Sequence, residues 1–377
     1  MPIRVYIIYL SKTRTVGSLA KDFVYNYYIP MENKLSENAK YTNEIISSNR
    51  SFLMGIAILW VVLYHIPEEC ALPVIGFIKN AGYGGVDIFI FLSGFGAFYS
   101  LKKSEDALSF LKRRLIRLFP SYLLFIIIFM IVQKVTSKLY FTEICGNLTM
   151  TGWWAGTPDQ FNWYIDCIIL FYILAPYIFG VIKRGTGKIL ATALMILFAF
   201  LISIGFMHSQ QLIAMVRLPI FILGFAFAGV ECKLTEKRFA IIFWNIVGVI
   251  GWGLLVFFMN QSTIDNWHYG TYWYPFFLIV PGLVIDLSLL GSLLESNVIT
   301  SKIKSFFMIM GTASFEIYLW HILIFEKILP GVSLPMNTGM LGSLLSVIVS
   351  LIIGYADFKL ISFLKSNMNF KKKEINL

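Results

Sequence analysis

Residues 84–95, "GGVDIFIFLSGF", place one acid, Asp87, in a run of otherwise apolar or small residues. An unpartnered carboxylate is costly to bury, and ionisable residues inside a bilayer are rare and usually functional. The stretch therefore predicts that Asp87 faces a charged partner, or a charge that develops during a reaction.

Composition places the whole chain in a membrane. Hydrophobic residues make up 58% of the 377 residues and charged residues 14%, against roughly 45–50% and about 25% in soluble domains. These values predict an all-α polytopic membrane protein with about ten spans of roughly 20 residues each. The predicted spans lie near residues 52–66, 83–101, 115–132, 163–182, 189–206, 214–230, 239–258, 273–294, 306–329 and 340–364.

The basic residues predict the orientation of these spans. The lysines and arginines fall in the amino-terminal segment, alternate loops and the tail, apart from Lys79, Lys134, Lys138, Arg217 and Lys327. The positive-inside rule therefore predicts that both termini are cytoplasmic. The net charge of +10 then follows from topology and indicates no nucleic-acid partner, although it suits anionic lipid or a phosphorylated substrate.

The predicted domains are a cytoplasmic leader at 1–45 with no assigned fold, a membrane domain at 46–365 and a basic cytoplasmic tail at 366–377. The four cysteines show no metal-ligand spacing, so no metal site is predicted. They are Cys70, Cys145, Cys167 and Cys232.

Several polar residues lie within the predicted spans. They are His65, Asp87, Ser93, Asp166, Arg217, Glu316 and His321. At about 1.5 Å per residue, His65, Asp87, Asp166 and His321 come from four spans at similar height near the outer side. We therefore expect a shared polar cavity, and His65 is the leading catalytic candidate because imidazole accepts and returns a proton near neutral pH.

Structural alternatives remain for each of these residues. A lone histidine such as His321 is often a packing residue, and Asp87 can serve as the partner of an arginine or a helix terminus. Asp166 follows Trp163 and Tyr164, so its side chain can simply reach the outer membrane interface.

Two further patterns concern binding. In "SFEIYLWH", Ser314, Tyr318 and His321 share one helix face at i, i+4 and i+7, and a polar stripe of this kind is expected to face protein or water. In "FLKRRLIRLFPSY", Arg113, Arg114 and Arg117 begin a span. They suit either membrane anchoring or a bidentate phosphate clamp.

Six blocks in chain order resemble the membrane acyltransferase-3 family, the ten-helix O-acyltransferases of bacterial surface sugars and peptidoglycan. The blocks are "GIAILWVVLYH" ending at His65, "GGVDIFIFLSGF", "RRLIRLFPSY", "WYIDCIILFYILAP", "RLPIFILGFAFAG" and "SFEIYLWH". The resemblance implies an acyl-CoA co-substrate, usually acetyl-CoA, with no permanently bound cofactor. It also implies a sugar hydroxyl acceptor and a bacterial plasma or inner membrane.

The resemblance also implies roles for residues. His65 becomes the general base or a transient acyl carrier, Asp87 orients it, and the Arg113, Arg114 and Arg117 cluster lies near the CoA phosphates. The residues expected to bind the acceptor are Ser314, Tyr318, His321, Trp163, Asp166 and Arg217.

One position departs from the family pattern. The family carries an arginine eleven residues before the histidine, where this chain has Met54. Arg50 lies one helical turn earlier, and we expect its long side chain to replace part of the missing cation.

Two other functions suit a helical membrane protein with intramembrane charges. One is a lipid-linked glycan or small-solute exporter without acyltransferase activity. The other is a glycan polymerase, for which the predicted outer loop at 133–162, with Trp153 and Trp154, is the sugar-binding candidate.

Overall fold

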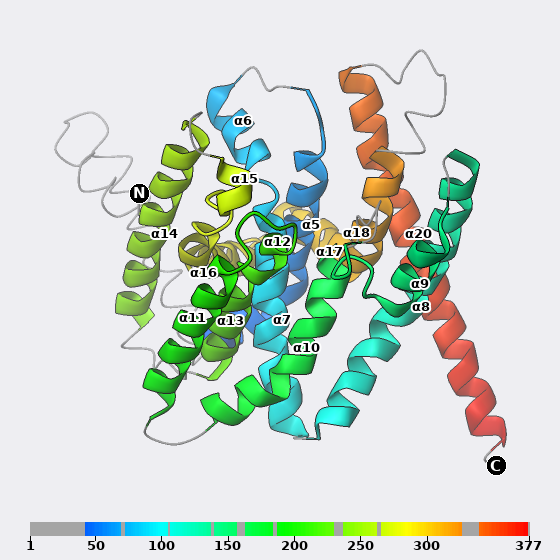
Figure 1. Ribbon diagram of the computed structural model, residues 1–377, viewed down its shortest axis with the longest axis horizontal. Coiled ribbons are helices and arrows are strands. Elements are labelled where there is room, and N and C mark those ends of the chain that lie inside the picture. Colours follow the sequence, from blue (N-terminus) through cyan, green and yellow to red (C-terminus); the bar gives the residue numbers. More distant parts are fainter. Residues whose placement is uncertain are drawn as a thin grey trace. The chain divides into compact units, whose positions relative to one another are not determined.

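The computed structural model describes residues 42–68, 72–104, 106–136, 139–156, 163–183, 187–229, 237–261, 265–325 and 339–375. Regular structure in these ranges is helical, without strands, which confirms the predicted all-α class. In chain order the helices are α4 (Thr42–Ser48), α5 (Arg50–Tyr64), α6 (Pro73–Asn80), α7 (Gly84–Lys103), α8 (Ala107–Thr136), α9 (Phe141–Thr149), α10 (Trp163–Ile182), α11 (Lys188–Ile204), α12 (Leu212–Met215), α13 (Leu218–Gly229), α14 (Lys237–Met259), α15 (Asn266–Tyr269), α16 (Phe276–Leu293), α17 (Val298–Thr312), α18 (Ser314–Leu323) and α20 (Met340–Ile375) (Figure 1).

Seven spans in the described part of the chain are long and apolar enough to cross a membrane, or eight if the bent pair α17 and α18 counts as one. The shorter helices α5 and α11 are also apolar. Each of the ten predicted spans overlaps one of these helices or pairs, so the protein is a multi-pass membrane protein. The exact number of crossings and the side of each terminus stay predictions.

The ninth predicted span, 306–329, is wrong in shape. Its helix begins earlier, at Val298, and breaks at Ala313, where α18 turns by 70° from α17. The break falls in "GTAS", where glycine, threonine and serine have low helix propensity. The hydroxyl of Thr312 also donates to the carbonyl of Ile309 (2.7 Å), a type of bond that bends helices.

The described chain divides into two compact units. Unit 1 combines the residues up to Leu53 with Ile90–Phe98 and Val181–Phe306, and unit 2 combines Met54–Phe89, Tyr99–Gly180 and the residues from Phe307 onward.

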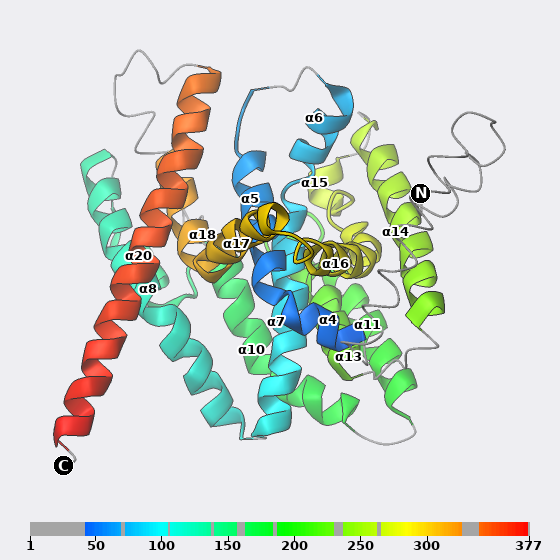
Figure 2. The same ribbon diagram turned by 180° about the vertical axis from the view of Figure 1, so that it is seen from behind.

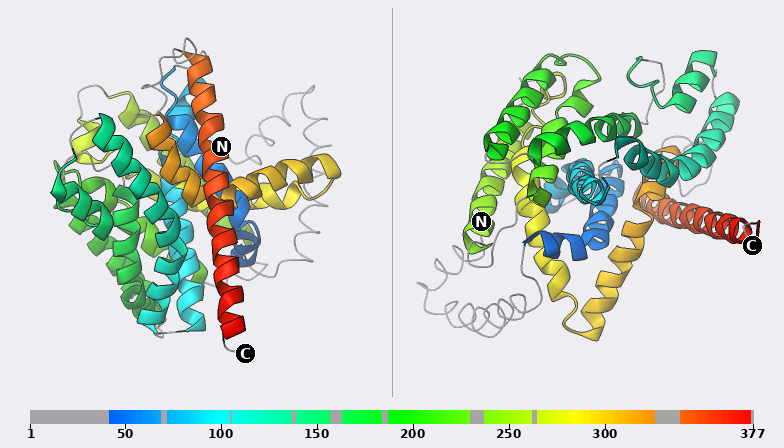
Figure 3. Two further views of the ribbon diagram at one scale, coloured as in Figure 1. Left: turned by 90° about the vertical axis from the view of Figure 1, so that its right-hand side faces the viewer. Right: turned by 90° about the horizontal axis from the view of Figure 1, so that it is seen from below.

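In unit 2, α8, α18 and α20 pack against one another, and α9 packs on α8. Figure 2 labels α8, α18 and α20 together, and the left panel of Figure 3 shows them again with α20 in red. The hydroxyl of Tyr122 on α8 donates to the carbonyl of Asn147 on α9 (2.7 Å), which fastens the short helix to the long one.

In unit 1, α14 packs on α16, α11 on α13, and α4 on α16. Backbone contact between α7 and α13 depends on two glycines: a Cβ at Gly94 or at Gly224 would lie 2.1 Å from a carbonyl oxygen of the other helix. Small residues permit this close approach of membrane helices. Within residues 84–95, position 94 is glycine because any larger residue would clash with α13.

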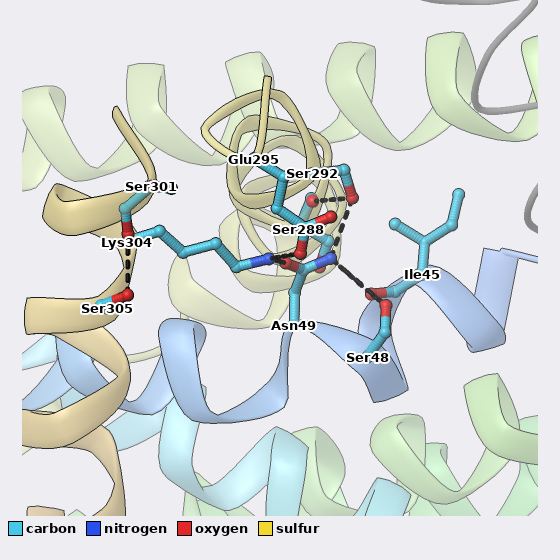
Figure 4. A network of polar contacts seen from close by, with 9 residues as sticks. All are labelled: Ile45, Ser48, Asn49, Ser288, Ser292, Glu295, Ser301, Lys304 and Ser305. Carbon is cyan, nitrogen blue, oxygen red and sulfur yellow. Dashed lines mark hydrogen bonds and ion pairs between the residues drawn. The ribbon is translucent and has the colours of Figure 1, made fainter. Parts of the chain in front are cut away.

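A buried lysine network also belongs to unit 1 (Figure 4). The ammonium of Lys304 on α17 donates to Asn49 Oδ1 (2.7 Å) and pairs with Glu295 (2.5 Å). The amide of Asn49 donates to the carbonyl of Ile45 (3.1 Å) and to the hydroxyl of Ser292 (3.0 Å). The network therefore ties α4 to α16 and α17, although the sequence pattern placed Lys304 in a solvated cytoplasmic loop.

Candidate active site

Two histidines predicted to share one height meet in unit 2. His65 directly follows the last residue of α5, and His321 lies near the end of α18. Their ring centroids are 4.8 Å apart and their planes meet at 74°. The structure thus pairs the leading catalytic candidate with a second imidazole, which we call the imidazole pair.

Backbone contacts set the tautomer of both rings. Nδ1 of His65 lies 2.9 Å from the carbonyl oxygen of Val61, and Nδ1 of His321 lies 2.6 Å from that of Tyr318. A carbonyl oxygen only accepts, so each Nδ1 carries a hydrogen and each neutral ring keeps its lone pair on Nε2. Nε2 is therefore the atom of each ring that can accept a proton.

The two rings differ in access. His321 is 0% exposed, and its Nε2 has no hydrogen-bond partner among the described residues. His65 is half-buried, with the rings of Tyr64 and Phe325 at 5.1 and 6.3 Å. A substrate therefore reaches His65 more readily, and His321 lies behind it.

Asp87 lies in the first turn of α7 and is fully buried. Two residues earlier, Gly85 lies against α5, where an added Cβ would approach the carbonyl oxygen of Ala57 to 2.4 Å. Asp87 is thus held beside a tight contact between α5 and α7. Its role in orienting His65 stays a prediction.

Asp166 fastens the segment before α10. One oxygen of its carboxylate accepts from the backbone N–H of Trp153 (3.1 Å), and its own carbonyl accepts from the indole of Trp154 (3.2 Å). The side chain is buried, which argues against the alternative that it reaches the membrane interface. The ring of Trp163 lies 6.5 Å from that of Trp153, and acceptor binding by Trp163 and Asp166 stays a prediction.

The polar stripe on α18 faces protein. Ser314, Tyr318 and His321 are all buried. The ring of Tyr318 lies 4.8 Å from that of Tyr164 and 5.3 Å from that of His321. The stripe therefore leads directly to the imidazole pair.

The three arginines of α8 differ in their surroundings. Arg113 and Arg117 are exposed one turn apart, whereas Arg114 is half-buried with its guanidinium 5.1 Å from the ring centroids of both Phe110 and Tyr172. Stacking of this kind holds a guanidinium in place. Arg113 and Arg117 are consequently the better placed of the three for a phosphate.

Two predicted cations belong to unit 1. Arg50 lies against α7, where its guanidinium donates to the carbonyl of Leu92 (3.5 Å). Arg217 is buried, donates to the carbonyl of Ile213 and lies 5.7 Å from the ring centroid of Trp273. Their roles in binding donor and acceptor stay predictions.

The sequence reasoning missed the partners of Glu316. The hydroxyl of Ser121 on α8 donates to Glu316 (2.7 Å), and the indole of Trp320 donates to Asp357 on α20 (2.9 Å). Asp357 is an acid inside the predicted span 340–364, and that position is the signal by which it could have been found.

Fold and site together define a multi-pass helical membrane protein that holds an imidazole pair and carries two exposed arginines in the first half of α8. A family model described as an acyltransferase domain matches residues 52–356. The chain belongs to this acyltransferase-3 family, which confirms the resemblance seen in its motifs.

Curated relatives match more distantly. The O-acetyltransferase OatA of Staphylococcus aureus is 24% identical over 316 residues, covering 71% of this chain and 49% of the relative. The regulator of hypoxia-inducible factor 1 of Caenorhabditis elegans is 28% identical over 178 residues, covering 36% of each chain. The match thus spans half or less of these relatives' lengths. No solved structure matches the chain.

Proposed function

We propose that the protein is an integral-membrane O-acyltransferase of a bacterial plasma or inner membrane. It moves an acyl group, acetyl in the first instance, from cytoplasmic acyl-CoA to a hydroxyl of a cell-envelope glycan or lipid-linked sugar. The observation that carries the proposal is the contact of His65 with His321, with Nδ1 of His65 bound to the Val61 carbonyl, in a chain of this family. The name of the OatA relative supports acetyl as the group transferred.

In this proposal one imidazole, that of His65, serves as the base for acyl transfer. Nε2 of His65 takes the proton of the acceptor hydroxyl as its oxygen attacks the thioester carbonyl. The carbon–sulfur bond breaks, the ester bond forms, and CoA leaves as a thiolate that then takes up a proton. In the two-step form of the reaction, Nε2 carries the acyl group between donor and acceptor.

The remaining residues have supporting roles in this proposal. Arg113 and Arg117 hold the CoA phosphates, and Arg114 stacks on Phe110 and Tyr172. Arg50 replaces part of the cation that Met54 lacks. Asp87 stabilises the His65 imidazolium, as a buried acid beside a basic histidine commonly does.

The test is acyl transfer by the purified protein in liposomes supplied with labelled acetyl-CoA and envelope glycan. Replacing His65 with alanine is expected to lower the rate by about 10²–10⁴-fold, the usual contribution of a general base. His268→Ala is the matched control because His268 is exposed and belongs to unit 1. Equal rates for both variants would remove the catalytic assignment.

A second measurement separates this function from export and polymerisation. Envelope polysaccharide from cells with and without the protein is analysed for ester-linked acetyl groups. Loss of the ester with unchanged polymer length and amount supports acyl transfer, whereas loss of the polymer itself contradicts it.

A further inference from the structure

Among the buried acids of unit 2, one pair lies on the neighbouring helices α18 and α20. Glu316 on α18 is 7% exposed and Asp357 on α20 is 5% exposed. Each accepts a hydrogen bond, from Ser121 and Trp320 respectively. The second oxygen of Asp357 is buried and has no hydrogen-bond partner among the described residues.

Packing of α18 on α20 brings the two acids to the same level of unit 2. Trp320, which binds Asp357, lies one turn after Glu316 on α18, so both carboxylates lie along the same stretch of that helix. Two neighbouring carboxylates in an apolar region do not both ionise readily, and a pair of this kind readily holds a proton.

Contacts between α8 and α18 give the order of these groups along the unit. Ser121 contacts Glu316, and one turn later the ring of Phe125 lies 5.5 Å from that of Trp320. The two helices therefore run in the same direction here. Arg117 precedes Ser121 by one turn of α8, at the exposed arginine end of the helix.

The imidazole pair lies at the opposite end of this row of groups from Arg117. His321 directly follows Trp320, and it is about 7.5 Å beyond Glu316 along α18. Its buried Nε2 has no hydrogen-bond partner among the described residues. The two acids thus lie between the arginine end of α8 and the imidazole pair.

We propose that Glu316 and Asp357 form a proton relay between the imidazole pair and the arginine end of α8. The proposal rests on the proposed function. The acceptor hydroxyl loses a proton at His65, and the CoA thiolate gains one on the cytoplasmic side. The relay returns the first proton to the cytoplasmic side, so the overall exchange of an acyl group for a proton moves no net charge.

Without the relay, the proton leaves on the acceptor side and the thiolate takes its proton from the cytoplasm. One positive charge is then exported per ester formed. A membrane potential of 100 mV, negative inside, opposes that export and lowers the equilibrium constant of ester formation by about 50-fold. A relay removes this opposition.

The experiment uses proteoliposomes with acetyl-CoA in the lumen, acceptor glycan outside and a pH dye on each side. Below the ordinary pKa of a thiol, about 8.5, the wild-type protein is expected to form ester without acidifying the outside. Its rate is also expected to be the same with and without a potassium diffusion potential.

Glu316→Gln and Asp357→Asn are expected to slow transfer by about 10-fold or more, to acidify the outside by one proton per ester and to make the rate depend on potential. Asp286→Asn is the matched control, because Asp286 is an acid in a span of unit 1, where Asn245 donates to it (3.1 Å). A merely structural role for the acids would not change the side on which the proton appears.

Three outcomes distinguish the proposals. A wild-type protein that releases one proton outside per ester overturns the relay, and this measurement needs no variant to fold. Both variants keeping the wild-type rate and its independence of potential would also overturn it. A wild-type protein that forms no ester at all contradicts the proposed function instead.

Discussion

Replacing Lys304 with methionine tests how much the buried lysine network stabilises unit 1. Lys304 is 5% exposed, and its partner Asn49 is 2% exposed. Methionine keeps most of the apolar stem but removes the donor to Asn49 Oδ1. A buried acceptor left unsatisfied costs about 1–3 kcal/mol.

The ion pair with Glu295 adds little to this figure. The Glu295 side chain is 67% exposed, and exposed pairs contribute about 0–1 kcal/mol. We therefore expect Lys304→Met to lower the free energy of unfolding by about 2 kcal/mol, with most of the loss caused by Asn49 rather than by Glu295.

The assay is unfolding of the purified protein in mixed micelles by increasing denaturing detergent. Lys302→Met is the matched control, since Lys302 is exposed on the same helix. In a double-mutant cycle with Asn49→Leu, we expect a coupling of about 1 kcal/mol or more. If Lys304→Met is no more destabilising than Lys302→Met, the network contributes no stability and the reasoning is refuted.

Three further predictions concern the site. Gly85→Ala forces α5 from α7 and is expected to lower both the thermal midpoint and acyl transfer, whereas Gly253→Ala, with nothing within 4 Å of its added Cβ, does neither. His321→Phe keeps a ring behind His65 but removes Nε2. We expect kcat to fall about 10-fold or more with an unchanged KM for acyl-CoA, measured by initial rates. Arg113→Ala is expected to raise that KM about 10-fold, and Lys112→Ala, its exposed neighbour, to change it less than twofold.

The sequence predicted the helices well because long apolar runs leave few alternatives in a membrane. The 163–182 span, for example, coincides with α10. Its aromatic and aliphatic residues form a helix that satisfies its own backbone, as a lipid environment requires. The same reasoning failed at residues 295–305, because Lys302 and Lys304 marked them as a loop although most of them belong to α17. Charge alone does not distinguish a solvated lysine from one that donates a hydrogen bond to a buried asparagine.

Site residues were predictable as types but not as partners. His65 and His321 stood out because histidine is rare in an apolar run, and they meet. Asp166 also stood out, yet its contact with the backbone of Trp153 depends on how the preceding segment folds back. Neither composition nor helical spacing predicts this contact, because it depends on the tertiary arrangement of two different segments.

His65 and His321 meet because of a bend between α17 and α18, and not because His321 lies at the expected depth of a straight helix. The sequence estimate took His321 as about 15 residues along a straight ninth span. The structure breaks that span at Ala313, so His321 is only seven residues beyond the first residue of α18, about 10 Å of helix. The direction of α18 is set by its own contacts with α8 and α20. The position of His321 relative to His65 therefore depends on these two neighbours, which also supply Ser121 and Asp357. The same packing that builds the acid pair positions the second imidazole, and this common origin is why the two features occur together.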